Sequence, residues 1–289
     1  MDNLEWRPLR GVDPDRLSEA RLQAHHAVQW LARAARAFVP PQPDDAHTSL
    51  GWDAGVDGFM THRLQDGTTR LSLQIPALTL ALHSGAGPLR IQSFPLTGRS
   101  ETQTRQWLGE QLGALGYDPQ ALDAPPPYEI PAHPISAGAR YDTAGSADAL
   151  TEIAAWYANA QIALDRVHRQ IIGRKLEASA VRCWPHHFDL ATQIVFSMNA
   201  DMPGNIGAGF SPGDEYYAEP YFYVSVYPEP DPAMLPMLPA MGHWHTHEFT
   251  AGVKPAHKIL AAKDRATETD DFLQGSVAIA FQILGQVAK

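Results

Sequence analysis

Two blocks of alternating apolar and polar residues constrain the fold more than any other feature of this chain. They cover residues 59–91 and residues 178–253. Successive side chains of an extended strand point to opposite faces, so a period of two predicts strands with one face toward a core. The first block contains the turn sequence Gln65-Asp66-Gly67 and therefore indicates an antiparallel meander.

The second block predicts a larger sheet. The sequence Ser211-Pro212-Gly213-Asp214 is typical of a turn, and it predicts a wide hairpin between the second and third strands of this block. The strands are expected at residues 178–197, 205–210, 221–227 and 242–253.

Four stretches with apolar residues at three-to-four spacing predict helices around these strands. Asp13-Pro14 is typical of a helix start, and Ser100-Glu101-Thr102-Gln103 has the form of a capping box. Helices outside the strand blocks, together with antiparallel strands, predict an α+β fold in which antiparallel sheets pack against about four helices. The helices are expected to begin near Asp13, Ser100, Ser146 and Thr269.

A proline-rich stretch divides the chain. Residues 118–136 contain six prolines, which is incompatible with a continuous helix. The boundary separates two parts of the chain. Residues 1–135 contain one helix, the meander and a second helix. Residues 136–289 contain a long helix, the His- and aromatic-rich sheet and a C-terminal helix. The first part carries the apolar pattern of only one sheet face, so the two parts are expected to form one compact unit.

The charge balance and the lack of apolar runs exclude several classes of partner. Lys and Arg number 22 against 32 Asp and Glu, which gives a net charge of -10. Binding to a phosphate backbone requires basic surface, so no nucleic acid partner is expected. No stretch reaches the roughly 20 apolar residues that span a bilayer. Cys183 is the single cysteine, and the first residues lack the pattern of a signal peptide, so we expect a cytoplasmic protein without a membrane partner.

Three histidines at alternate positions predict a metal site. His243, His245 and His247 share one face if their segment is a strand, and neighbouring pairs are then about 7 Å apart. All three cannot easily bind one ion, so two of them are expected to act with a third ligand, His187 or Asp189. Such a set suits a divalent metal, zinc or iron.

Carboxylates and aromatic residues near these histidines predict a substrate pocket. A His beside a carboxylate is a general-base pattern, for which Asp189 and Glu248 are the candidate catalytic residues. Glu248 points away from the histidine face in a regular strand, unless a bulge intervenes. The aromatic residues can line a ligand pocket or equally fill a sheet–helix interface. The candidate substrate-binding residues are Trp184, Tyr221, Tyr223, Tyr227 and Trp244.

Three hypotheses for the function remain open at this point. The first is a metal-dependent enzyme that acts on a small organic substrate, in a hydrolytic or lyase-type reaction. The second is a non-catalytic protein that binds a small molecule or a partner in an aromatic cavity. The third is a homo-oligomer in which the His243–His247 strand forms an interface.

Several pieces of the second half have a specific order and spacing, namely Pro185-His186-His187-Phe188-Asp189-Leu190-Ala191, Ala208-Gly209-Phe210-Ser211-Pro212-Gly213 followed by Tyr223 to Tyr227-Pro228-Glu229-Pro230, and Phe272-Leu273-Gln274. In these pieces the chain resembles a known family. The resemblance is to an uncharacterised bacterial family, a domain of unknown function, and it extends over residues 180–285. It implies no activity and supports only the fold. The residues 243–248 depart from the family pattern, which would make the metal site particular to a subgroup.

Overall fold

The computed structural model describes residues 5–85, 90–199 and 202–285. Backbone contacts divide the chain into two units. The C-terminal unit comprises Met1–Gly11, Ala155–Arg182 and Asp189–Lys289, and the N-terminal unit comprises Val12–Ala154 and Cys183–Phe188. Each unit contains one antiparallel sheet with helices, so the predicted α+β class is confirmed. No helix among the described residues is long and apolar enough to cross a membrane.

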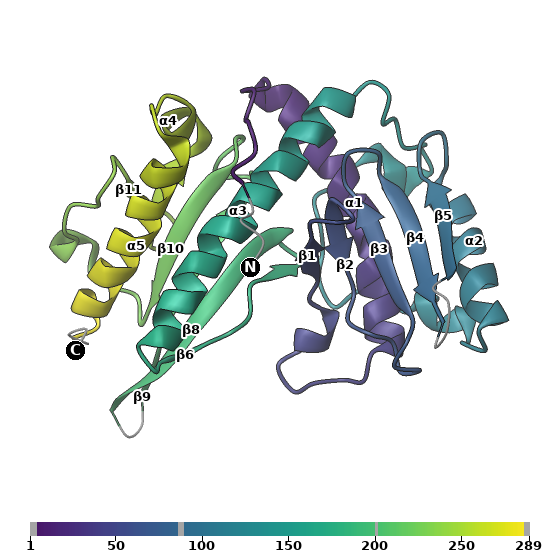
Figure 1. Ribbon diagram of the computed structural model, residues 1–289, viewed down its shortest axis with the longest axis horizontal. Coiled ribbons are helices and arrows are strands. Elements are labelled where there is room, and N and C mark those ends of the chain that lie inside the picture. The colour runs from purple at the N-terminus through teal and green to yellow at the C-terminus, as the bar shows by residue number, and fades with distance from the viewer. Residues whose placement is uncertain (1–4, 86–89, 200–201, 286–289) are drawn as a thin grey trace. The chain divides into compact units, whose positions relative to one another are not determined.

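The N-terminal unit is built on a five-stranded sheet whose strand order follows the chain (Figure 1). Every neighbouring pair is antiparallel, as predicted for the meander. The strands are β1 (Gly51–Asp53), β2 (Gly58–Met60), β3 (Arg70–Gln74), β4 (Thr79–Ser84) and β5 (Arg90–Pro95).

Two helices of this unit begin where their capping residues predict. Helix α1 (Pro14–Phe38) has Asp13 as its N-cap and packs against β3. Helix α2 (Glu101–Ala114) has Ser100 as its N-cap, and Ser100 and Gln103 complete the capping box. The proline-rich connector contains short 3-10 helices instead of being wholly extended. They are η2 (Pro119–Asp123) and η3 (Pro134–Ala137). Another short 3-10 helix, η1 (Ala46–Thr48), follows α1.

The C-terminal unit contains the larger sheet, with neighbouring strands in the order β11-β12-β10-β9-β8-β6. β9 and β10 form the predicted hairpin around residues 212–220. The short strand β7 (Arg182–Trp184) lies where the two units divide. The strands of the sheet are β6 (Glu177–Ala178), β8 (Asp189–Asn199), β9 (Met202–Ser211), β10 (Tyr221–Tyr227), β11 (His243–His245) and β12 (Ala251–Pro255), with the 3-10 helix η4 (Pro232–Met234) between β10 and β11.

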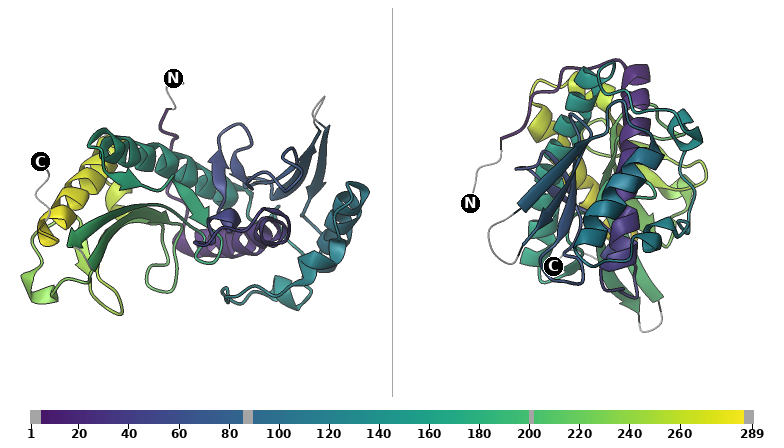
Figure 2. Two further views of the ribbon diagram at one scale, coloured as in Figure 1. Left: turned by 90° about the horizontal axis from the view of Figure 1, so that it is seen from below. Right: turned by 90° about the vertical axis from the view of Figure 1, so that its right-hand side faces the viewer.

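Two helices cover one face of this sheet. Within the C-terminal unit, α3 (Ala147–Gly173) and α5 (Arg265–Ile283) lie on the same side of the strands, as the left panel of Figure 2 shows. The rings of Trp156 and Tyr157 on α3 lie 6.1 and 5.3 Å from the ring of Phe210 on β9. All three side chains are buried, so alternate residues of the strands form the core beneath the helices.

The strand register places a second set of residues on the opposite face. Tyr223 on β10 pairs with Gly209 on β9 and with Val253 on β12. Val253 in turn pairs with His243 on β11. Directly paired residues of antiparallel strands point to the same face, so this row lies on the face away from α3 and α5. We call it the open face.

The structure corrects three predicted elements. The single strand expected at residues 178–197 is divided into β6, β7 and β8. Residues 242–253 are not one strand but the hairpin of β11 and β12. The backbone between them includes Glu248 in the left-handed region, at φ 65°, which lets the chain reverse. Helix α5 begins at Arg265 with Asp264 as its cap, earlier than the predicted Thr269, because the carboxylate of Asp264 accepts from the backbone N–H of Thr267 at 3.0 Å. The short helix α4 (Ala256–Leu260) was not predicted.

Candidate functional site

The open face of the C-terminal unit combines an apolar floor with polar groups. Tyr221, Ala251 and Val253 form a buried cluster, against which Tyr217, Tyr223 and Phe249 pack. Further along the same face, Val195 and Tyr227 are 47% and 57% exposed. These two residues share a row through their common partner Asn205. The face is therefore buried at one end and open to solvent at the other.

The hydroxyl of Tyr217 is held between two imidazoles. It lies 3.0 Å from Nε2 of His243 and 3.2 Å from Nδ1 of His245. Nε2 of His245 is 2.7 Å from the carbonyl oxygen of His247. A carbonyl can only accept, so this nitrogen carries the hydrogen, and the neutral ring presents a lone pair at Nδ1. Tyr217 then donates to His245 and accepts from Nε2 of His243.

Burial keeps both His243 and Tyr217 in their neutral forms. Burial lowers the pKa of His243, and the charge of Lys258 lowers it further. Nδ1 of His243 is buried and has no hydrogen-bond partner within the described residues. Burial raises the pKa of Tyr217, and the negative charge of Asp214 adds to this rise. Opposite shifts in neighbouring groups are a feature of acid–base sites.

Asp214 organises the loop that carries Tyr217. Its Oδ1 accepts from the backbone N–H groups of Tyr216 at 2.9 Å and of Tyr217 at 3.0 Å. Its Oδ2 accepts from the hydroxyl of Tyr221. An aspartate that bonds to backbone two and three residues later is the usual stabiliser of such a turn. The turn sequence after β9 thus positions Tyr217 over the open face.

A glycine allows Tyr223 to reach across a neighbouring strand. A Cβ atom at Gly209 would lie 2.3 Å from Cζ of the Tyr223 ring, so only glycine leaves room for the ring there. The hydroxyl of Tyr223 donates to Oδ2 of Asp189, at the start of β8. Burial raises the pKa of Tyr223 well above its usual value, and the charge of Asp189 acts in the same direction.

Three rings and a carboxylate meet at the edge of this face. The ring of His245 lies 4.3 Å from that of Phe249 and 5.2 Å from that of Tyr216. The hydroxyl of Tyr216 donates to Oε2 of Glu248. This bond, together with nearby negative charge, raises the pKa of Tyr216 to about 12. The left-handed backbone at Glu248 lets its side chain reach Tyr216 although β11 has ended.

The structure brings together most, but not all, of the predicted site residues. His243, His245, Asp189, Tyr221 and Tyr223 lie on the open face, and Glu248 joins them from the turn after β11. The predicted shared strand face for all three histidines was wrong for His247, which lies in the β11–β12 connection and contributes a carbonyl oxygen to His245.

Two further predicted residues of this unit lie away from the Tyr217 cluster. Trp244 points to the other face of β11, where its Nε1 donates to the carbonyl of Pro236 at 2.7 Å. Tyr227 is at the exposed end of β10.

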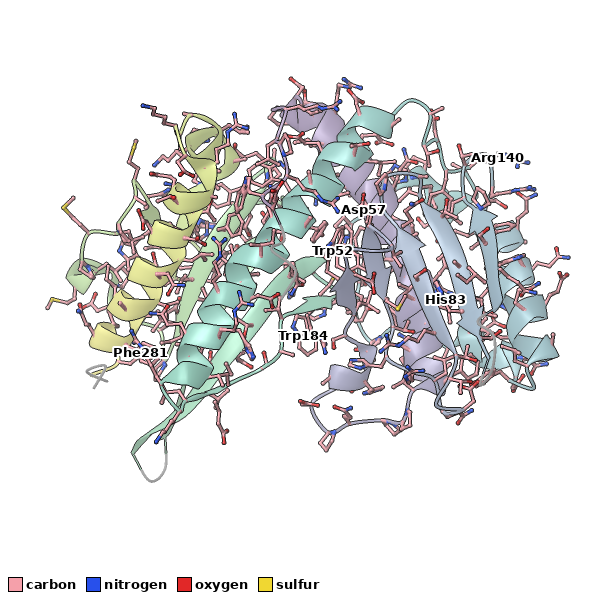
Figure 3. The ribbon with its side chains drawn as sticks, in the orientation of Figure 1. Trp52, Asp57, His83, Arg140, Trp184 and Phe281 are labelled. Atoms are coloured by element: carbon pink, nitrogen blue, oxygen red, sulfur yellow. The ribbon has the colours of Figure 1, made fainter. Side chains whose placement is uncertain are left out.

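Trp184 and His187 belong to the N-terminal unit (Trp184 is labelled in Figure 3). Within that unit, the ring of His186 lies 6.3 Å from Trp184, 4.2 Å from His187 and 5.5 Å from Tyr128. Burial lowers the pKa of His186 to about 4. This turn forms an aromatic group of the N-terminal unit.

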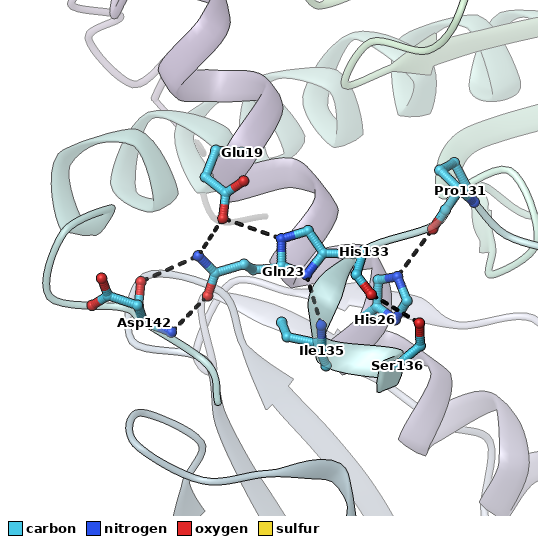
Figure 4. A network of polar contacts seen from close by, with 8 residues as sticks. All are labelled: Glu19, Gln23, His26, Pro131, His133, Ile135, Ser136 and Asp142. Atoms are coloured by element: carbon cyan, nitrogen blue, oxygen red, sulfur yellow. Dashed lines mark hydrogen bonds and ion pairs between the residues drawn. The ribbon is translucent and has the colours of Figure 1, made fainter. Parts of the chain in front are cut away.

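Another polar network of the N-terminal unit has a structural role (Figure 4). Gln23 donates to Glu19 at 2.9 Å and accepts from the backbone N–H of Asp142 at 2.8 Å. Nε2 of His26 lies 3.0 Å from the carbonyl of Pro131, and Nε2 of His133 lies 3.2 Å from Glu19. These hydrogen bonds hold α1 against the segment that follows α2.

Sequence reasoning missed four members of the open-face site, namely Asp214, Tyr216, Tyr217 and Phe249. Asp214 was assigned only to a turn, although an Asp that follows Gly and precedes two aromatic residues predicts backbone bonds that would position both rings. Tyr217 could not be linked to His243, because residues 26 positions apart meet only through strand pairing.

No group of three or more His, Cys, Asp and Glu side chains suited to a metal ion occurs in residues 5–85, 90–199 and 202–285. His243 and His245 are nevertheless two imidazoles whose nitrogens approach one oxygen atom. A metal at this point would need Tyr217 as its third protein ligand.

Comparison with known proteins identifies a family but no activity. A model described as a family of unknown function (DUF5996) matches residues 13–285. No curated protein and no solved structure matches the chain. The matched region covers most of both units and every residue of the open-face site. The chain therefore belongs to the DUF5996 family, a family of unknown function.

Proposed function

We propose that the open face of the C-terminal unit binds a small organic molecule and that Tyr217 transfers a proton during its conversion. The observation that supports this proposal is the position of the Tyr217 hydroxyl, hydrogen-bonded to His243 and His245 at once. Two imidazoles on one phenol provide both a proton acceptor and a donor within hydrogen-bond reach of the same oxygen.

The proton transfer has a simple form. The oxygen of Tyr217 takes a proton from the bound molecule while its own proton moves to Nδ1 of His245, which becomes an imidazolium. The Nε2 hydrogen of His243 stabilises negative charge that develops on the phenol oxygen. The reverse sequence returns the proton. A reaction that removes and returns a proton on a small molecule, such as a lyase-type elimination, needs both directions.

A Tyr217→Phe variant tests this proposal because the ring can still pack 4.9 Å from Tyr221. A panel of small organic compounds is screened for binding by NMR, and each binder is followed over time for conversion. We expect at least one compound that the wild type converts and that the variant binds but does not convert. Tyr128→Phe, which removes a hydroxyl in the N-terminal unit, is the matched control and should retain conversion.

Conversion that persists in Tyr217→Phe would contradict the assigned proton transfer. Binders that are lost with the open-face variants but never converted would favour the alternative of a non-catalytic binding protein.

A divalent zinc or iron ion at the same place is a second candidate. The specific observation in its favour is that nitrogens of His243 and His245 approach one oxygen, so an ion could join both imidazoles to the phenolate of Tyr217. Elemental analysis of protein purified without a His-tag tests this candidate. Near-stoichiometric metal that is lost in a folded His245→Ala variant would support it, and protein that stays metal-free after incubation with zinc and iron would refute it.

A further inference from the structure

We infer that the molecule bound at the open face is a cationic amine, held by the rings of Tyr216, His245 and Phe249 beside the carboxylate of Glu248. This inference rests on the proposed function, because it names the chemical class of the ligand for the same face. It follows from the hydrogen-bond inventory, the ring geometry and the local charge.

The hydroxyl hydrogens of the tyrosines at the site already form hydrogen bonds within the protein. Each phenol donates within the cluster, so what remains toward a ligand is oxygen lone pairs, carboxylate oxygens and ring faces. A ligand that supplies hydrogen-bond donors matches this surface, whereas an anion would find the phenol hydrogens occupied. The donor–acceptor pairs are Tyr216 with Glu248, Tyr217 with His245, Tyr221 with Asp214, and Tyr223 with Asp189.

The three rings pack against one another and form an aromatic corner beside Glu248. His245 and Phe249 are stacked, with an interplanar angle of 30°. Tyr216 stands nearly perpendicular to both, at 72° to His245 and 74° to Phe249. All three centroids lie within 5.2 Å of one another. Cation–π attraction acts over roughly 6 Å from a ring centroid, and a small ammonium group beside this corner can lie within that distance.

Negative charge surrounds the same corner. Glu248 accepts the hydrogen bond of the Tyr216 hydroxyl, and the charges of Glu215 and Asp214 act on the same phenol. A site where three carboxylates act on one exposed hydroxyl attracts a cation and repels an anion.

Lys258 and His257 lie near the neighbouring His243, and both form hydrogen bonds with other groups. Nζ of Lys258 donates to the carbonyl of Met241 at 2.8 Å. Nδ1 of His257 pairs with Glu219 at 2.6 Å. Neither bond involves the ring corner, so these groups do not occupy the place proposed for the ammonium.

Three probes of similar size and different charge test the inference: n-butylammonium, 1-butanol and butyrate. Binding to the full chain is measured by NMR titration of the aromatic ring signals. We expect n-butylammonium to bind more tightly than the other two. Glu248→Gln should weaken its binding about two- to five-fold, the effect of one exposed electrostatic contact. Tyr216→Leu, which removes one ring wall, should weaken it by a similar factor. Glu177→Gln, which removes a charge on β6, is the matched control.

The outcomes separate this inference from the proposed function. If butyrate or 1-butanol binds at these rings at least as tightly as n-butylammonium, the amine assignment is wrong and the proposed small-molecule site stands. Equal weakening by Glu177→Gln and Glu248→Gln would also overturn the assignment, because only net charge would then matter. If none of the probes, and no compound of the wider panel, shifts the ring signals of the folded protein, both proposals fail.

Discussion

Acidification should destabilise the N-terminal unit through His25. The side chain of His25 is 3% exposed, its Nε2 lies 2.9 Å from the carbonyl oxygen of Pro185, and its ring stacks 5.1 Å from that of Phe188. Burial lowers the pKa of His25 from 6.5 to about 4, against the opposing effect of the carbonyl bond. The folded protein thus binds this proton less tightly than the unfolded chain does.

The magnitude follows from the difference in pKa. Above pH 6.5 both states carry a neutral His25, and the free energy of unfolding is unaffected. Between pH 6.5 and about 4 the unfolded chain binds the proton first, so stability falls as pH falls. One pKa unit corresponds to about 1.4 kcal/mol, so His25 should remove about 3 kcal/mol of stability by pH 4.

Urea unfolding of the wild type and of His25→Gln and His25→Phe between pH 7 and pH 4 measures this effect. Other groups also titrate in this range, so the relevant quantity is the difference in the free energy of unfolding between wild type and each variant. That difference should change by about 3 kcal/mol in favour of the variants on acidification. The two variants can differ at pH 7 but must share the same pH-dependent change. A difference that stays constant with pH would refute the assigned cause.

Three other predictions concern particular contacts. Gly209→Ala should lower the free energy of unfolding by about 1–3 kcal/mol, because the new Cβ atom forces the Tyr223 ring aside. The NMR signals of Tyr223 should change as well. An unchanged stability would contradict the close approach. Asp214→Ala should lower the free energy of unfolding by about 2 kcal/mol, because two backbone N–H groups and the Tyr221 hydroxyl lose their acceptor. It should also shift the NMR signals of the Tyr216 and Tyr217 rings. Unchanged ring signals would show that other contacts hold the loop. Ser100→Ala should lower the free energy of unfolding, measured by thermal unfolding, by about 1 kcal/mol because it removes the N-cap of α2. Ser100→Thr should retain most of the stability. Equal losses in the two variants would argue against the cap.

The functional assignment was harder to predict than the fold, for a physical reason. His243 and His245 were identified because alternation along one strand is visible in the chain. Their partner Tyr217 lies in a loop between two other strands, and the contact forms only because β12 pairs with both β10 and β11. Pairing between strands depends on packing and register across the whole sheet.

The end of β11 shows the same limit at a smaller scale. Residues 242–253 alternate well enough to predict one strand, and Thr246 to Phe249 contain neither Gly nor Pro to mark a turn. The chain nevertheless reverses there, with Glu248 at positive φ. A single left-handed residue is tolerated when the hairpin it creates is paired with the rest of the sheet through β12, and that pairing is not local.

The sequence by itself determined the elements whose causes are local. The helices at Pro14–Phe38 and Glu101–Ala114 follow from caps and apolar periodicity, and the meander follows from alternation and turns. Only the tertiary structure decided which polar groups meet on the open face, because a hydrogen bond between Tyr217 and His243 depends on the positions of three strands. Local preferences act over a few residues, whereas a site assembled across a sheet exists only once the sheet has formed.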